Sequence, residues 1–461
     1  MVNDECKPFR HEQFILKFYA AWSCVEAMGD MMGNLWKASM AAAVLSGALS
    51  GCAGGGTSAG TAPPEVKAEP MKPVTLHLFQ HQTLLTQEDF NLLIAEPVKK
   101  KYPHITITLG KDTNIEKVVT AGEQIDLIAM WNGNIPSFQD LGLYEDMTPL
   151  LNKHKFDLSR FEPAALETIR SMSDKGELYA LPYAQQFNAL YYNKDVFEKF
   201  GVTYPQDGMT WEEAIELGKK VTRLDNGVQY RGLDPDHLTR ILFPMSLNLI
   251  DLKTAKSQVT SDPYRKVFET GKAIYAIPGN KPANLKQSAI TAFMKEKNVG
   301  MLATINIFNN LKQYPDLNWD VSQFPSYKER PNQYGMYDLH TMLVSKSSAN
   351  KDDAMRVLEV LFSNEVQLIS SKKTARLSML QDPEYRKVFG QDIPYLQGKR
   401  IQSIFKSKSP ASPAFSPYYA KSIDMARDLF IDYVNDKMDV NTALRTLDEK
   451  IMQYIETEKK K

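Results

Sequence analysis

Polar and aromatic side chains follow two predicted strands of the chain, at the point where each strand ends. Gln80 and His81 follow the strand predicted over 74–79, and Trp131 and Asn132 follow the strand predicted over 125–130. Amides and an imidazole form hydrogen bonds with polar groups, whereas an indole offers a flat apolar face. In open α/β sheets, ligands bind at the carboxyl ends of the strands. The pattern therefore predicts that these four residues contribute to a binding site.

The sequence contains none of the common catalytic motifs. It has no G-x-S-x-G, no H-E-x-x-H and no phosphate-binding loop. The three cysteines are Cys6, Cys24 and Cys52, so the chain after them has no thiol nucleophile and no thiolate metal site. The stretch 234–237 (Asp-Pro-Asp-His) has metal-ligand residue types, but Asp-Pro-Asp is first of all a turn signal. We expect no metal, no cofactor and no catalysis, with an extracellular carbohydrate-active enzyme as the alternative, since paired carboxylates are easily found in such a chain.

The strands that position the first candidates alternate with helices. Apolar patterns predict strands over 74–79, 104–109 and 125–130. Between them, apolar residues at helical spacing predict one helix after the cap Thr86 and another over 115–121. This order is that of βαβ units and predicts an α/β fold with a parallel sheet.

Further helices are predicted along the rest of the chain. Thr210 and Glu213 form a capping-box pattern, and a turn over 225–227 closes the helix that follows. Asn350 is expected to cap another helix, and the tail over 422–459 is amphipathic and helical. No internal repeat is present.

Length and charge limit the classes of function. The chain has 461 residues and 43% hydrophobic residues, enough for a large core and at least two domains. Its 55 basic and 55 acidic residues balance to a net charge of +0. Nucleic acids and anionic membrane surfaces attract proteins with a basic surplus, so neither is expected as an electrostatic partner.

The N-terminal part has the features of an exported lipoprotein. An apolar run over 38–50 is too short for a membrane span but suits the core of a signal peptide. Leu49-Ser50-Gly51-Cys52 resembles the bacterial lipobox, which implies cleavage before Cys52 and its modification with fatty acyl chains such as palmitate. We therefore expect a signal region over 1–51 and a lipidated, flexible tether over 52–73. A cleaved secreted protein or a cytoplasmic protein is the alternative.

The first thirty residues do not suit a signal peptide, because they are acidic where a short basic segment is expected. The expectation is that translation starts at Met31 or Met32.

Several ordered motifs carry a family resemblance. They are DLIAMWNGNIPSFQDLGLYEDMTPLL (126–151), GELYALPYAQQFNALYYNKDVFEKFGVTYPQDGMTWEEAIELGKKVT (176–222), NVGMLATIN (298–306) and TMLVSKSSANKDDAMRVLEVLFS (341–363). Over 74–456 the chain resembles the extracellular solute-binding proteins of bacterial ABC importers, family 1, the group that includes maltose-binding protein.

The resemblance implies a two-lobed α/β fold, the type II periplasmic-binding-protein-like fold, with a cleft between lobes joined by hinge crossings. Lobe 1 is expected to comprise 74–184 and 333–378, and lobe 2 to comprise 185–332 and 379–461. The proline in the stretch 178–183 suits a strand that leaves one sheet for another, and the resemblance makes this the first hinge crossing.

The resemblance also adds candidate binding residues at the cleft. Many relatives carry a carboxylate where this chain has Gln186, and an aromatic residue where it has Asn306. Arg376 could clamp a ligand or pair across the hinge. Trp131 could stack on a sugar ring or plug its lobe, whereas Tyr191 and Tyr192 are expected in the core. The added candidates are Gln186, Phe187, Asn306, Tyr337, Asp338 and Arg376.

The predicted function is that of a substrate-binding lipoprotein of an ABC importer. It would capture a carbohydrate, a mono- or oligosaccharide, by lobe closure and deliver it to the permease subunits of the importer. We expect a monomer that binds no nucleic acid and is lipid-anchored at the extracellular face of the bacterial cell membrane. A surface binding or sensing protein with a non-sugar ligand is a further alternative.

Overall fold

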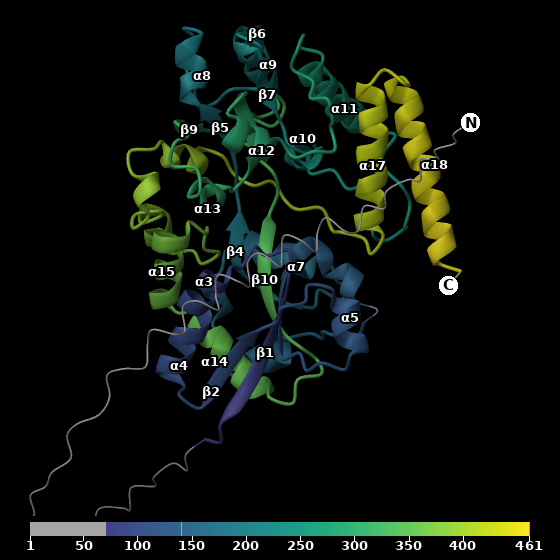
Figure 1. The fold of residues 1–461 in the computed structure, drawn as a ribbon. Coiled ribbons are helices and arrows are strands. Elements are labelled where there is room, and N and C mark those ends of the chain that lie inside the picture. The colour runs from purple at the N-terminus through teal and green to yellow at the C-terminus, as the bar shows by residue number, and fades with distance from the viewer. Residues whose placement is uncertain (1–70, 140, 461) are drawn as a thin grey trace, which may run out of the picture. The chain divides into compact units, whose positions relative to one another are not determined.

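The computed structural model describes residues 71–139 and 141–460 (Figure 1). The predicted signal region, nearly all of the predicted tether and Cys52 lie outside these residues. None of the described helices combines the length and the apolar composition that a membrane span requires.

One of the two sheets in the described residues has the strand order β2-β1-β3-β10-β4. Its strands are β1 (Val74–His81), β2 (Ile105–Leu109), β3 (Leu127–Trp131), β4 (Leu181–Gln186) and β10 (Asp338–Val344). Strand β1 pairs in parallel with β2 and β3, whereas β10 is antiparallel to β3 and β4. The three strands predicted near the start of the folded part are confirmed, and they form the parallel part of this sheet.

The other described sheet has the order β6-β7-β8-β5-β9. Its strands are β5 (Asn188–Asn193), β6 (Arg223–Asp225), β7 (Val228–Asp234), β8 (Val299–Ile305) and β9 (Trp319–Ser322). The predicted turn over 225–227 does not follow the helix directly. It joins β6 to β7, because Asn226 and Gly227 both adopt the positive φ angles that a tight hairpin turn needs.

The helices cover the faces of both sheets (Figure 1). They are α3 (Gln87–Phe90), α4 (Glu96–Lys101), α5 (Ile115–Thr120), α6 (Thr148–Lys153), α7 (Pro163–Arg170), α8 (Lys194–Lys199), α9 (Trp211–Val221), α10 (Thr239–Leu242), α11 (Asp262–Tyr275), α12 (Ala289–Thr291), α13 (Phe308–Leu311), α14 (Lys351–Leu361), α15 (Asn364–Thr374), α16 (Glu384–Lys387), α17 (Tyr419–Val434) and α18 (Val440–Glu458). Helices α4 and α14 contact the first sheet, whereas α8, α9 and α11 contact the second.

Local capping explains where several helices begin. The Thr86 hydroxyl accepts a hydrogen bond from the Asp89 amide at the start of α3. Thr210 and Glu213 form the predicted capping box of α9. The predicted C-terminal helix is divided into α17 and α18, which pack side by side, and Asp439 caps the second.

The chain passes between the sheets through short segments. Strand β4 of the first sheet ends at Gln186 and β5 of the second begins at Asn188, so the first passage lies at Phe187. The segment between β9 and β10 returns the chain to the first sheet. After α15, Leu377 forms an isolated bridge with Gln185, next to the first passage.

The core of the second sheet includes the two tyrosines of β5. Tyr191 and Tyr192 are 0% and 1% exposed, which confirms that they pack in the core. The Tyr191 hydroxyl accepts a hydrogen bond from the Ile307 amide. Burial of both side chains fixes the position of β5 and therefore of the passage that precedes it.

The carboxylate of Asp207 ties three distant segments together. It accepts hydrogen bonds from the Gln323 amide (2.8 Å), Arg400 (3.1 Å) and Lys406 (2.6 Å). Burial by itself raises the pKa of Asp207, but the hydrogen bonds from Lys406, the Gln323 amide and Ser403 outweigh it and lower the pKa to about 2. The ionised form therefore stabilises the folded state.

We predict that Asp207→Asn lowers the free energy of unfolding at pH 7 by about 1–2 kcal/mol, since hydrogen bonds to a charged group are lost. A carboxylate with a lowered pKa stabilises the folded state above its unfolded pKa, and this contribution is lost as the pH falls toward 2. The deficit should therefore shrink between about pH 4 and pH 2 in denaturant titrations. Asp432→Asn, which removes one exposed ion pair with Lys437, is the control and should have little effect. An equal deficit at all pH values would contradict the prediction.

Candidate functional site

Two adjoining cavities lie at the ends of the strands that carry the predicted site. The first has a volume of about 440 Å³ and the second about 510 Å³. Both are lined by residues that follow β1, by β4 and by residues from the end of β8 or beyond it. Four residues line both cavities, namely Gln82, Leu84, Gln186 and His340.

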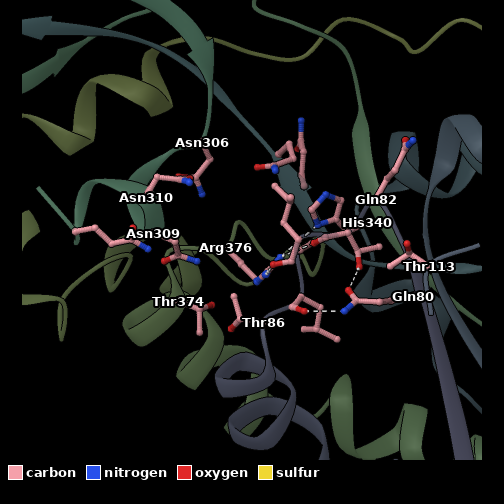
Figure 2. Close-up of a pocket in the computed structure, with 17 residues that line it drawn as sticks. Gln80, Gln82, Thr86, Thr113, Asn306, Asn309, Asn310, His340, Thr374 and Arg376 are labelled. Atoms are coloured by element: carbon pink, nitrogen blue, oxygen red, sulfur yellow. Dashed lines mark hydrogen bonds between the residues drawn. The ribbon is translucent and has the colours of Figure 1, made fainter. Parts of the chain in front are cut away.

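The first cavity is lined mainly by amides and hydroxyls (Figure 2). In Figure 2, Gln80 and Gln82 come from the end of β1, whereas Asn306, Asn309 and Asn310 come from β8 to α13. Such side chains offer both donors and acceptors without a net charge. The cavity therefore suits a neutral ligand with many hydroxyl groups.

The second cavity combines aromatic rings with charged groups. The rings of Trp131 and Tyr419 both line it, with centroids 6.0 Å apart. Phe415 packs against each of these rings, at 5.2 Å and 4.7 Å, and so supports them from behind the lining. Arg240 and Asp338 line the same cavity. Flat apolar faces beside charged hydrogen-bonding groups suit a ring that carries polar substituents.

Arg240 and Asp338 are partly buried in the second cavity. Burial raises the pKa of Asp338 to about 6, although the charge of Arg240 and the indole of Trp131 act to lower it. The guanidinium of Arg240 forms no hydrogen bond with another described residue, and its Nε atom is buried. Leaving buried polar groups without hydrogen-bond partners costs free energy, and a ligand that supplies the partners recovers it.

The histidines of the cavities are neutral near pH 7. Burial lowers the pKa of His237 to about 4, and the charges of Arg240 and Arg427 act in the same direction. Burial and the charge of Arg376 hold the pKa of His340 well below its usual range. Each neutral imidazole has one donor and one acceptor nitrogen, and Nδ1 already accepts from the Thr239 amide in His237 and from Arg376 in His340.

The pairing of β10 with β4 explains which hinge residues reach the cavities. Gln186 is paired with Asp338, and Ala184 with His340, and all four line a cavity. Successive side chains of a strand point to opposite faces. Tyr337, one residue before Asp338, instead lines a separate cavity of about 320 Å³.

Six of the ten candidate residues line one or both cavities: Gln80, Trp131, Gln186, Asn306, Asp338 and Arg376. Among the described residues the Gln186 side chain has no hydrogen-bond partner, which leaves both ends of its amide available. Arg376 is instead committed within the protein, since it pairs with Asp89 at 2.9 Å and donates to the carbonyls of Thr83 and Leu84.

The other four candidates lie outside both cavities, for different reasons. The Asn132 side chain is 0% exposed and is hydrogen-bonded to the backbone of Tyr337 and Leu339. Phe187 is also 0% exposed and packs against Phe308 and Phe389. His81 contacts the Thr113 carbonyl and the Phe138 ring. Tyr337 lines the separate cavity described above.

The Asp-Pro-Asp-His stretch has structural partners. Asp234 pairs with Arg231, and Asp236 accepts hydrogen bonds from Ser288 and the Ala289 amide. Asp236 also adopts a φ of 61°, as turns allow. In the described part of the chain, no group of three or more His, Cys, Asp or Glu residues is placed to hold a metal ion.

Several lining residues carry no signal in the sequence. Gln82 and Leu84 lie in the loop after β1, Arg240 lies in the short helix α10, and Tyr419 begins α17. The last two are more than a hundred residues distant from the β1 loop along the chain. Only the folded arrangement brings them to one cavity.

The sequence of residues 85–368 matches the bacterial extracellular solute-binding protein family. The chain belongs to this family. The expected membership is thereby confirmed, and the family is one of binding proteins.

Individual proteins that are similar to this solute-binding protein are also binding proteins. A binding protein of Brucella abortus is 25% identical over 296 residues, which are 59% of this chain and 68% of the relative. The lactose-binding protein of Rhizobium radiobacter is 24% identical over 230 residues, 48% of this chain and 53% of the relative. An ABC substrate-binding protein from Listeria monocytogenes in complex with cycloalternan superposes with a TM-score of 0.69 and 18% identity, over 83% of this chain and 99% of that chain. The likeness confirms the type II periplasmic-binding-protein-like fold.

We predict that Asp338→Asn stabilises the unliganded solute-binding protein near pH 7. A carboxyl group with a raised pKa costs stability as the pH rises from its unfolded value, about 4, to its folded value, about 6. The variant should therefore melt at a higher temperature than the wild type at pH 8, and the gain should vanish at pH 4. Asp174→Asn, at an exposed position, is the control and should show no such dependence. Destabilisation at pH 8 would overturn the assignment.

Proposed function

We propose that this solute-binding protein captures a carbohydrate in the cleft and delivers it to the membrane permease of an ABC importer. The observation that carries the proposal is the composition of the two adjoining cavities. Amides and hydroxyls line one, and aromatic rings line the other beside Arg240 and Asp338. Sugars present both hydroxyl edges and apolar C–H faces, which such groups bind.

Arg240 and Asp338 are the side chains that we expect to hold hydroxyl groups in the second cavity. A hydroxyl can donate to the carboxylate and accept from the guanidinium, so one sugar would satisfy both. Trp131 and Tyr419 would pack against the ring of the sugar. Gln186, which lines both cavities, would donate or accept at the floor of the cleft.

The names of the relatives support the same class of ligand. The relative from Rhizobium radiobacter is a lactose-binding protein, and the solved relative from Listeria monocytogenes is an ABC substrate-binding protein with bound cycloalternan. A membership in a family of binding proteins supports transport over hydrolysis, so we propose that the chain is not an enzyme. A carbohydrate-active enzyme and a surface sensor with a non-sugar ligand remain as alternative outcomes of the experiment below.

We propose that capture proceeds by closure of two lobes. The lobes would correspond to the two sheets with their helices, joined by the passage at Phe187 and by the two later passages. Each cavity has lining residues from both sides, such as Gln80 and Asn306 in the first. A ligand that contacts both lobes favours the closed state by its differential affinity. We expect a monomer to carry out this cycle.

The first test is a melting-temperature screen with mono-, di- and trisaccharides, including lactose. A sugar that binds should stabilise the protein by RT ln(1 + [L]/Kd), about 2.7 kcal/mol at a hundredfold excess over Kd. Gln186→Ala and Trp131→Ala should each weaken binding by about 1–3 kcal/mol, because a hydroxyl loses its partner or a ring loses its stacking face.

Gln453→Ala is the matched control, because this glutamine is exposed on α18 and lines neither cavity. It should leave the shift unchanged. Recovery of the sugar unaltered supports a transport binder, whereas its hydrolysis supports an enzyme. A shift with a peptide or an ion and with none of the sugars would contradict the carbohydrate assignment.

We further propose that Cys52 is acylated and anchors the mature protein to the extracellular face of the bacterial membrane. The lipobox-like sequence before it supports this proposal. Two or more acyl chains are sufficient for stable membrane attachment. The fold begins at β1, more than twenty residues later, and so does not depend on the anchor.

We predict that Cys52→Ser abolishes acylation and membrane attachment while leaving the melting temperature of the folded part unchanged. Membrane fractionation and mass spectrometry of the mature N-terminus measure the two effects. Ser58→Ala, a substitution in the same tether, is the control and should remain attached. A mature N-terminus at an unmodified residue other than Cys52 would refute the anchor.

A further inference from the structure

The two cavities meet at an apolar side chain. Among the four residues that line both cavities, Leu84 is the apolar one, and its side chain is 59% exposed. Gln82, Gln186 and His340 are polar. Large hydrophobic residues with this much exposure are few in the described residues, and Leu84 is the one at the cleft. An exposed apolar side chain that lines both cavities is in a position to contact a ligand there.

The backbone that presents Leu84 adopts an unfavourable conformation. Gln82 and Leu84 have φ angles of 56° and 52°, in the left-handed region that residues with side chains rarely occupy. Two such residues so close together need support from the surrounding structure, and strain of this kind is typical of functional sites.

Arg376 provides that support from a distant part of the chain. It donates to the Leu84 carbonyl at 2.6 Å and to the Thr83 carbonyl at 3.3 Å. Its ion pair with Asp89, at 2.9 Å, is buried on both sides and fixes the direction of the guanidinium. Gln80 adds a hydrogen bond from its amide to the Leu85 carbonyl at 2.9 Å. The loop is thus held at both ends of the exposed leucine.

We propose that Leu84 divides the cleft into two sugar subsites, so that the ligand is a saccharide of at least two linked rings, and that Arg376 is the positioning residue of this divider. The proposal rests on the proposed function and deepens it. One ring occupies the amide-lined cavity by hydrogen bonding, and the other stacks in the aromatic cavity. Leu84 cannot hydrogen-bond a hydroxyl, so the ligand presents an apolar face or the glycosidic linkage at this point. Each volume lies within the range of single ligand pockets.

The test is calorimetric titration of the wild type and the variants with three series of sugars of increasing length. The first series is glucose, maltose and maltotriose, the second is mannose, mannobiose and mannotriose, and the third is galactose and lactose. The disaccharide of at least one series should bind the wild type about 100-fold more tightly than its monosaccharide, because linked rings bind two subsites together. Leu84→Ala should weaken that disaccharide about tenfold, through the loss of apolar contact with the linkage, and change the monosaccharide by less than about twofold. Leu224→Ala, at another exposed leucine, is the control and should change neither.

Arg376→Lys keeps a positive charge beside Asp89 but loses the forked contact with two carbonyls. This variant should lower the ratio of disaccharide affinity to monosaccharide affinity. If the ratio is the same as in the wild type, the positioning role of Arg376 is overturned, but the two-subsite proposal is not. Equal wild-type affinity for a monosaccharide and its disaccharide, or an equal loss of both in Leu84→Ala, overturns the two-subsite proposal while the proposed function stands. Absence of binding to every sugar overturns the proposed function and this inference with it.

Discussion

The antiparallel pairing of β10 with β4 is the constraint on which the rest of the site depends. Strand β4 lies at one edge of the first sheet, beside β10, and leads directly into the second sheet through Phe187. Their register places Gln186 opposite Asp338 and Ala184 opposite His340. Because strand side chains alternate between faces, a slip by one residue would turn Gln186 and Asp338 away from the cavities. The hydrogen bonds of Asn132 to the backbone of Tyr337 and Leu339 hold β10 in this register.

The cleft differs from the core in how its polar groups are satisfied. Arg376 is buried, and its terminal nitrogens pair with Asp89 and two backbone carbonyls, so its charge is balanced although its Nε atom has no hydrogen-bond partner among the described residues. Arg240 is partly buried and has no hydrogen bond to another described residue, and Asp338 has a raised pKa. In the proposed function, hydroxyl groups of the ligand would offset the free energy lost by desolvating these groups. In the proposed function, Arg376 therefore supports the structure of the site, whereas Arg240 is available to bind the ligand.

The sequence was a good guide to the elements whose signals are local. The strands near the N-terminal end of the fold, the cap of α3 and the capping box of α9 depend on residues within a few positions of one another. The break between α17 and α18 and the hairpin of β6 and β7 were harder to see, because their boundaries depend on packing against other elements as well as on local propensity. The family resemblance added the two-lobed fold with hinge crossings, which no periodicity specifies.

For the site, the sequence by itself determined which residue types stand at the carboxyl ends of the parallel strands, and Gln80 and Trp131 line the cavities from these positions. The neighbours of these two residues, His81 and Asn132, were equally plausible by position, yet each is engaged within the protein. The tertiary structure alone decided this, and it alone brought Arg240, Tyr419 and the β1 loop together from distant parts of the chain. The physical reason is that the face a side chain points to, and the partners it meets there, depend on strand register and on packing between segments far apart in sequence, which local patterns do not encode.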